Sequence, residues 1–411
     1  MRFRGNGINM YGASAGKRDA QYSGGRFVAS RTRRARSVAA FVVLIAGWLC
    51  GDRTDQHSFA NSPPGQADGR EYELRRAGQM WDAAKFGSGT VRGFGVGRLS
   101  DTDLYDLAGT GANVVRKFLN LHRAVKSDEY VVDAQQLVEL DRLVTFALNH
   151  KFKVVVTFEP LPNQFAQEFW DNSSLKDSIV DAWRQIAKRY EHSPAIAAYD
   201  LINEPITKRP WDDGGQEEWL NFATKIVAAI REIDPKRVVV FEPSPGGLPF
   251  GFSAVHRLIP FSNIVYSAHV YQPHQLTHQG LYSYKMPYSY PGIWNKSDLF
   301  ALLAPVKDFA KRHDVNIYIG EFSAVRWAPG CSAERYVSDA MSIFEAEKWS
   351  WSYHAWREYQ GWDLELPESW FRRFPYKDAK PQGFETADQS KVRVETNIYR
   401  MILQKFLQNT P

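Results

Sequence analysis

Eight short apolar segments recur between residues 91 and 356, with helical patterns between most of them. Each segment is rich in β-branched or aromatic residues, is bounded by turn or polar residues, and has the length of a buried strand. The eight segments are Val91–Val96, Asn113–Leu119, Lys153–Glu159, Ile196–Asn203, Arg237–Glu242, Ile264–Tyr271, Asn316–Phe322 and Trp349–Trp356. Strands spaced in this way restrict the chain to an α/β architecture.

Amphipathic helices are predicted between most of these strands. Within Asp133–His150, for example, Leu137, Leu140, Val144 and Leu148 recur at a helical spacing. The same pattern is found in Ser174–Tyr190, Glu217–Ile233, Ser297–His313 and Ser332–Glu347, and Asn397–Leu407 closes the chain. Strands that alternate with helices are expected to pair in parallel through right-handed crossovers.

Both an open doubly wound sheet and a closed barrel contain such crossovers. An open nucleotide-binding sheet carries a glycine-rich phosphate loop after its first strand. Gly93-Phe94-Gly95-Val96-Gly97 is the nearest stretch, and it lacks the GxGxxG spacing. We therefore predict a single closed (β/α)8 TIM barrel, with its active site at the C-terminal ends of the strands.

The net charge of +5 is divided unevenly along the 411 residues. Residues 1–50 hold nine Arg or Lys and one acidic residue, which gives +8. The remaining 361 residues hold 42 of the 51 basic and 45 of the 46 acidic residues, which gives −3. The overall charge of the body therefore gives no reason to expect a nucleic-acid partner.

The basic region is followed by an uncharged run, Val38–Cys50. This run is too short for the roughly 20 residues that cross a bilayer as a helix. A basic stretch, a short apolar run and then small polar residues are typical of a secretory signal, with Ser58-Phe59-Ala60 as a candidate cleavage site. An uncleaved membrane anchor and a start codon placed too early are the alternatives. We expect residues 1–70 to form a signal or leader and a linker, and the protein to be secreted or periplasmic.

Polar or aromatic residues stand where most of the predicted strands end. They are Arg116 on strand two, Glu159 on three, Asn203 and Glu204 on four, Glu242 on five, His269 and Tyr271 on six, Glu321 on seven and Trp356 on eight. Two carboxylates across a cleft suit hydrolysis of a glycosidic bond, because one donates a proton to the leaving oxygen and the other attacks the anomeric carbon. Four glutamates compete for these two roles.

Five segments around these strand ends carry a family resemblance. They are Asn113-Val114-Val115-Arg116, Ala198-Tyr199-Asp200-Leu201-Ile202-Asn203-Glu204-Pro205, His269-Val270-Tyr271, Ile319-Gly320-Glu321-Phe322 and Trp351-Ser352-Tyr353-His354-Ala355-Trp356. In this order, the segments resemble glycoside hydrolase family 5, the cellulase-like members of clan A, over residues 85–360. Residues 71–411 are then expected to form one catalytic domain.

The resemblance implies that Glu204 is the acid/base and that Glu321 is the nucleophile. Asn203 is expected to bond the sugar 2-hydroxyl, an interaction that strengthens in the transition state. Hydrogen bonds donated by Arg116 and Tyr271 would hold Glu321 ionised.

Three further residues are assigned to the substrate region. His269 is expected to orient or tune Glu204, and Trp356 to offer an apolar face to the sugar at the cleavage point. Glu159 departs from the family pattern, which usually has a histidine at the end of strand three. An extra carboxylate there would alter the hydrogen bonds to the sugar or balance a nearby cation, so it bears on the preferred sugar more than on the reaction.

Other polar residues near the strand ends have structural interpretations. Glu242 has no family motif around it, which favours a structural role. Asp200 is expected to form hydrogen bonds inside the barrel. His274 and His278 have the i, i+4 spacing of a metal pair but lack the glutamate of the zinc-protease motif, which favours solvated loop residues.

These observations predict a retaining glycoside hydrolase that acts on a β-linked polysaccharide or oligosaccharide without a metal or other cofactor. An endo-β-1,4-glucanase is the first expectation, and a β-mannanase or another β-glycanase is the second. A catalytically silent carbohydrate-binding barrel is the alternative from a different class. Contact with a membrane is expected only through an uncleaved leader.

Overall fold

The computed structural model describes residues 80–124, 129–160, 168–281, 284–371 and 393–410. The predicted leader and linker, residues 1–70, lie outside the described residues. None of the helices in the described part of the chain is long and apolar enough to span a membrane.

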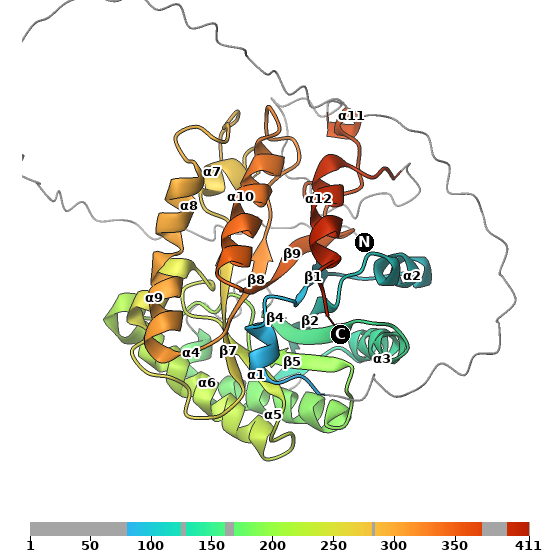
Figure 1. The fold of residues 1–411 in the computed structure, drawn as a ribbon. Coiled ribbons are helices and arrows are strands. Elements are labelled where there is room, and N and C mark those ends of the chain that lie inside the picture. Colours follow the sequence, from blue (N-terminus) through green and yellow to red (C-terminus); the bar gives the residue numbers. More distant parts are fainter. Residues whose placement is uncertain (1–79, 125–128, 161–167, 282–283, 372–392, 411) are drawn as a thin grey trace, which may run out of the picture. The chain divides into compact units, whose positions relative to one another are not determined.

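Eight parallel strands close into a barrel, as predicted (Figure 1). The strands are β1 (Arg92–Val96), β2 (Val114–Arg123), β4 (Lys153–Pro160), β5 (Ile196–Asp200), β6 (Val238–Phe241), β7 (Ile264–Val270), β8 (Ile317–Phe322) and β9 (Ser350–Trp356). Each strand pairs with the next, and β1 pairs with both β2 and β9, which closes the ring. A short strand, β3 (Tyr130–Val132), adds to the end of β2 in the antiparallel direction.

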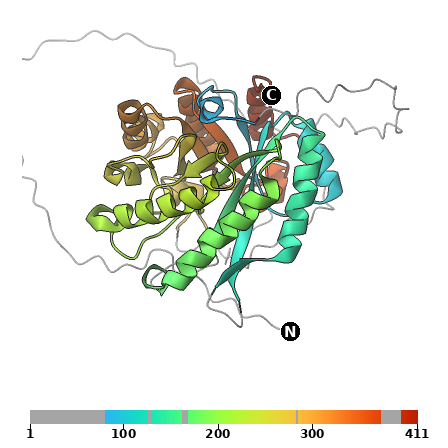
Figure 2. The same ribbon diagram turned by 90° about the horizontal axis from the view of Figure 1, so that it is seen from below.

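Helices run along the outside of the strands, as Figure 2 shows from below. The longer helices are α2 (Asp101–Gly109), α3 (Ala134–Leu148), α5 (Ser173–Tyr190), α6 (Gln216–Arg231), α8 (Lys296–Leu302), α9 (Ala304–His313), α10 (Ser332–Ala346) and α12 (Asn397–Phe406). Short helical turns are α1 (Ala83–Phe86), α4 (Glu168–Asp171), η1 (Trp211–Gly215), η2 (Pro249–Ala254), α7 (His274–Thr277) and α11 (Glu368–Phe371).

The helix predicted over Ser297–His313 is divided into α8 and α9 at Leu303. Pro305 lies in the first turn of α9, where a missing N–H costs nothing, whereas inside a continuous helix it would remove a hydrogen bond and clash with the preceding turn. The helix between β1 and β2, α2, was not among the predicted helices. Ser100 and Asp103 form a capping box at its start.

The barrel interior changes character along each strand. At the N-terminal ends the inward residues are apolar and form one buried cluster, which includes Val114 and Val240. Two residues later, on the same face of each strand, stand Arg116 and Glu242, both fully enclosed. The charged layer therefore lies on an apolar floor at the C-terminal end of the barrel.

Candidate active site

The structure brings together seven of the eight residues predicted for the site. Arg116 lies on β2, Glu159 on β4, His269 on β7 and Glu321 on β8, while Asn203 and Glu204 follow β5 and Tyr271 follows β7. Hydrogen bonds or short charge contacts link all seven into one network. The eighth, Trp356, lies elsewhere.

Arg116 is the centre of this network, and its guanidinium group is fully buried. Its Nε donates to Asp200 at 2.8 Å, and its Nη1 donates to Glu321 at 2.7 Å. Its Nη2 donates to Asn203 at 2.9 Å and to Glu242 at 2.8 Å. A planar group with fixed donor directions therefore positions four acceptors from three parts of the barrel.

An irregularity in β8 places Glu321 beside this guanidinium group. Ala268 pairs with Ile319 and His269 with Glu321, so β8 has one residue more than β7 at this point. Such a bulge redirects the side chain that follows it. The extra residue is Gly320, where a Cβ would lie 2.8 Å from both Ser267 Oγ and His269 Nε2.

The environment of Glu321 favours its ionised form. Its Oε1 accepts from Arg116, and its Oε2 accepts from the hydroxyl of Tyr271 at 2.7 Å. Burial alone raises the pKa of Glu321, but the nearby His354, His269 and Arg116 and the Tyr271 hydrogen bond outweigh burial, so that pKa lies below its usual range. Glu321 is therefore an anion held in a fixed orientation.

Glu204 has a different environment. Its Oε1 lies 2.9 Å from Nδ1 of His269, its N–H donates to Glu242 at 2.9 Å, and a third of its side chain is exposed. Its φ of 47° is a left-handed conformation that non-glycine residues rarely adopt, and such conformations cluster at functional sites. Burial raises the pKa of its carboxyl, although His269 acts in the opposite direction.

His269 joins the two glutamates. Its Nδ1 faces Glu204 at 2.9 Å and Glu321 at 3.9 Å, and its Nε2 faces Glu242 at 3.2 Å. Burial lowers the pKa of His269, but the charges of Glu242 and Glu321 outweigh burial and raise that pKa well above its usual value. The imidazolium form then donates to Glu204, as expected of a residue that orients it.

Glu204, His269 and Glu321 each offer an atom within 4.8 Å of the others, which is close enough to hold a metal ion. The donor set does not favour one, because both nitrogens of His269 face carboxylates and its pKa is raised, so the imidazole holds protons instead of offering a lone pair.

Glu242 is enclosed behind the two candidate catalytic residues. It accepts from Arg116 and from the N–H of Glu204, and only 1% of the residue is exposed. Although burial raises the pKa of Glu242, His269 and then Arg116 outweigh burial and lower it. Its contacts are those of the structural role expected for it.

Glu159 lies at the end of β4 and is partly exposed. Its Oε2 accepts from Nδ2 of Asn203 at 2.5 Å, while Oδ1 of Asn203 accepts from Arg116. The Asn203 amide is therefore fixed from both sides. Burial, followed by the charges of Glu321 and Glu204, raises the pKa of Glu159 well above its usual value, which favours the neutral form of its carboxyl.

The prediction that Trp356 offers a face to the sugar is wrong. Only 1% of Trp356 is exposed, and its ring stacks on Phe94 at 6.0 Å, in the core between strands and helices. The reason is a bulge in β9, where Tyr353 pairs with Phe94 and Trp356 with Val96, so β9 has one residue more than β1. Regular alternation of inward and outward side chains would place Trp356 on the same face as Ser352, but the bulge turns it to the other face.

His354 is the residue that β9 directs toward Glu321, and the sequence did not assign it a role. Its Nδ1 lies 3.8 Å from Oε2 of Glu321. The signal was present in the strand-eight segment 351–356, because His354 shares the face of Ser352, whose hydroxyl bonds the inward Tyr318.

His274 and His278 are not solvated loop residues. Their rings lie 5.2 Å apart in an aromatic cluster with Tyr271, Tyr284 and Trp362. Burial lowers the pKa of both imidazoles, to about 3 for His278. The pair therefore packs beside the site as neutral rings.

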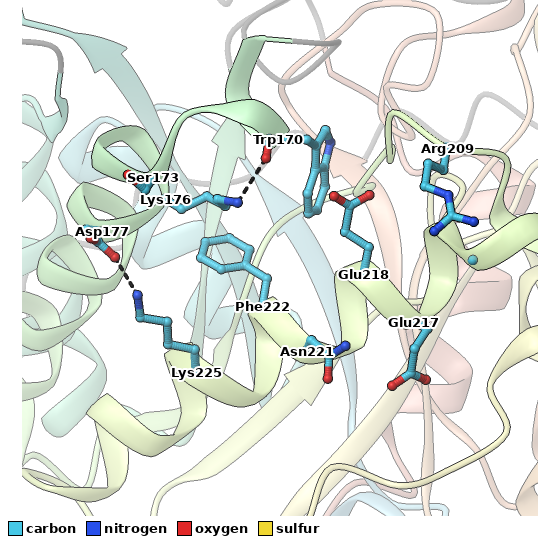
Figure 3. Close-up of a pocket in the computed structure, with 11 residues that line it drawn as sticks. Trp170, Ser173, Lys176, Asp177, Arg209, Glu217, Glu218, Asn221, Phe222 and Lys225 are labelled. Carbon is cyan, nitrogen blue, oxygen red and sulfur yellow. Dashed lines mark hydrogen bonds and ion pairs between the residues drawn. The ribbon is translucent and has the colours of Figure 1, made fainter.

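A separate hollow of about 640 Å³ lies between α5 and α6 (Figure 3). Two of its lysines have partners among the lining residues: Lys225 contacts Asp177, and Lys176 donates to the carbonyl oxygen of Trp170. None of the eight predicted site residues lines it.

A (β/α)8 barrel with paired carboxyl groups at the C-terminal strand ends, one favoured as an acid and one as an anion, is the architecture of a glycoside hydrolase. The chain belongs to the cellulase family, glycosyl hydrolase family 5, whose family model matches residues 86–360, well over half of the 411 residues.

Three similar proteins are 18–24% identical to the chain over the aligned residues. Endoglucanase C of Acetivibrio thermocellus is 24% identical over 284 residues, which cover 60% of this chain and 80% of the relative. A Thermotoga maritima Cel5A structure in complex with cellobiose aligns with a TM-score of 0.63 and 18% identity, over 79% of this chain and 99% of the other. The cellulose synthase subunit Z of Clostridioides difficile aligns with a TM-score of 0.62 and 20% identity, over 77% and 99%.

Proposed function

We propose that the chain is a retaining β-glycanase, in the first place an endo-β-1,4-glucanase, that cleaves its substrate by double displacement. The observation that carries this proposal is the distance between the candidate catalytic groups: a carboxylate oxygen of Glu204 lies within 4.8 Å of one of Glu321. Carboxyl groups about 5–5.5 Å apart are typical of retention, whereas inversion needs about 6.5–9.5 Å to admit a water molecule.

In the first step, Glu204 donates its proton to the glycosidic oxygen while Glu321 attacks the anomeric carbon. The raised pKa of Glu204 and the lowered pKa of Glu321 supply the two protonation states that this step needs. The glycosidic bond breaks, and an ester bond forms between the sugar and Glu321.

In the second step, Glu204 has lost its proton and acts as the base. It removes a proton from a water molecule, which attacks the anomeric carbon and releases Glu321 as a carboxylate. Arg116 and Tyr271 stabilise that carboxylate through the hydrogen bonds they donate to its two oxygens. Because both displacements invert the anomeric carbon, the product keeps the β configuration.

The sugar 2-hydroxyl is expected to bond the Asn203 amide, whose orientation Arg116 and Glu159 fix. The support for a glucan substrate comes from the relatives, whose names are endoglucanases. A β-mannan is the second candidate, because glucose and mannose differ at the 2-hydroxyl, beside the unusual Glu159. One Thermotoga maritima Cel5A structure with a TM-score of 0.58 is in complex with mannotriose.

A polysaccharide panel tests this proposal. Reducing-sugar release from soluble β-1,4-glucan, mixed-linkage β-glucan, β-mannan and xylan is measured with the purified protein, and with Glu321→Gln as the control for contaminating activity. We expect release from a β-1,4-glucan to exceed release from the others. No release from any β-glycan would contradict the proposed function.

We also propose that residues 1–70 direct export and do not contribute to the barrel. The +8 charge of residues 1–50, ahead of the apolar run Val38–Cys50, supports this proposal. A chain that starts at Glu71 is expected to unfold at the temperature of the full chain and to keep its activity. Loss of cooperative unfolding on removal of residues 1–70 would show that they belong to the folded domain.

A further inference from the structure

His354 stands on β9 beside the candidate nucleophile, and the steps above do not use it. Its Nδ1 lies 3.8 Å from Oε2 of Glu321, which is too long for a hydrogen bond but short for a charge interaction. That nitrogen is enclosed and has no hydrogen-bond partner among the described residues. A buried polar atom without a partner calls for a functional explanation.

Packing fixes the imidazole in this position. The His354 ring meets Phe118 at 5.5 Å and Trp362 at 5.4 Å, both in edge-to-face geometry, and 12% of its side chain is exposed. On β1, a Cβ at Gly95 would come within 2.9 Å of Nδ1. The missing side chain at Gly95 therefore leaves the space that the imidazole occupies.

We propose that His354 is a positioning residue for the nucleophile: the charge on its imidazole keeps Glu321 ionised and oriented, and so sets the acidic limit of the reaction. This inference rests on the proposed role of Glu321. The effect of His354 is on the glycosylation step, in which Glu321 must be a carboxylate when the substrate binds.

The other titratable groups around His354 leave Glu321 as its counter-charge. His278, at the end of α7, is kept neutral because burial lowers its pKa to about 3. Arg116 on β2 is a cation and already donates to Oε1 of Glu321, and both its guanidinium group and the His354 ring contact Phe118, at 4.9 Å and 5.5 Å from the centre of that ring. Of these three groups, Glu321 alone is negative, so a proton on His354 favours the carboxylate form of Glu321.

Two replacements of His354 separate its charge from its packing. His354→Phe keeps a ring against Phe118 and Trp362, and His354→Gln keeps hydrogen-bonding groups, but neither carries a charge. The measurement is kcat/KM for an aryl β-cellobioside between pH 3 and pH 8. Loss of the neighbouring charge raises the pKa of Glu321, so the acidic limb should move up by about one pH unit or more in both variants. KM on the plateau should change less than about twofold, because uniform binding of the substrate is kept.

His192→Gln is the matched control, because the His192 side chain is 91% exposed, and it should leave the acidic limb in place. Gly95→Ala is the independent test. Its added methyl group displaces the imidazole without changing its chemistry, so the limb should again move to higher pH.

An acidic limb that stays at the wild-type pH in both His354 variants overturns the inference. A fall in kcat/KM that comes only from a higher KM also overturns the inference, because His354 would then contact the sugar directly. A wild-type protein that cleaves no β-glycoside would refute the proposed function instead, so the two failures are distinguishable.

Discussion

Glu204 and Glu321 have carboxylate oxygens within 4.8 Å of each other, yet their neighbours move their pKa values in opposite directions. For Glu204, burial outweighs the effect of His269. For Glu321, nearby cations and the Tyr271 hydroxyl outweigh burial. The surroundings of two residues of the same type thus favour the protonated form of Glu204 and the ionised form of Glu321.

Glu204→Ala should separate the two displacement steps. An activated aryl glycoside leaves without a proton, so formation of the ester with Glu321 should continue, while its hydrolysis slows by about 10²–10⁴-fold for want of a base. Azide needs no base and should accelerate turnover, giving a β-glycosyl azide. Product analysis by NMR checks the configuration.

Glu321→Ala should abolish turnover of all substrates, because no other group is placed to form the ester. Azide is then expected to have no effect on natural substrates. Rescue of Glu321→Ala with formation of the α-azide is the control for a folded site. Rescue to the β-azide in Glu321→Ala, with formation of the α-azide by Glu204→Ala, would show that the two assignments are reversed.

The pH profile of kcat/KM should have a plateau whose acidic and basic limits lie on opposite sides of the pKa of an ordinary glutamic acid, which is about 4.3. Activity requires an ionised Glu321, so it is lost as pH falls through the lowered pKa of Glu321. Activity also requires a protonated Glu204, so it is lost as pH rises through the raised pKa of Glu204. A basic limb below pH ~4.3 would contradict these environments.

Glu159 variants test the role of the fixed Asn203 amide. Glu159→Gln replaces a neutral carboxyl with a neutral amide and should lower kcat/KM only a few-fold. Glu159→Ala leaves Nδ2 of Asn203 without its partner, which should cost about tenfold or more. The ratio of activities on β-glucan and β-mannan should change in Glu159→Ala. An unchanged ratio would remove Glu159 from the determinants of sugar preference.

Trp356→Ala should affect stability and not substrate binding. Removing a buried Trp is expected to lower the free energy of unfolding by about 3–5 kcal/mol. KM of the folded protein should stay at the wild-type value, because the ring packs on Phe94. Ile293→Ala, at a residue 84% exposed, is the surface control. A large increase in KM with unchanged stability would restore the stacking role.

The fold could be predicted because the alternation of strands and helices is a property of the whole chain. Each strand carries its own apolar signal, so an error in one would not change the architecture. The break between α8 and α9 could not be predicted from the apolar pattern. The apolar period continues across Leu303, and only the geometry of Pro305 ends one helix and starts another.

The site could be predicted where side-chain direction follows the regular pleat. Arg116 and His269 face inward, as their strands require. The two bulges in β8 and β9 break this rule, because a single extra residue reverses which face of the sheet each following side chain takes. The bulge in β8 brings Glu321 inward, where the motif had already indicated it, whereas the bulge in β9 turns Trp356 outward and leaves His354 at the site.

The most direct test of the account is the identity of the residue that carries the sugar during turnover. A 2-deoxy-2-fluoro-β-cellobioside with an activated leaving group slows the second step, so the ester accumulates and is located by mass spectrometry of the digested protein. One added sugar unit is expected on the peptide that contains Glu321, and none in Glu321→Gln. An adduct on Glu204, Glu159 or Glu242, or rapid turnover that releases the α-anomer without an adduct, would contradict it.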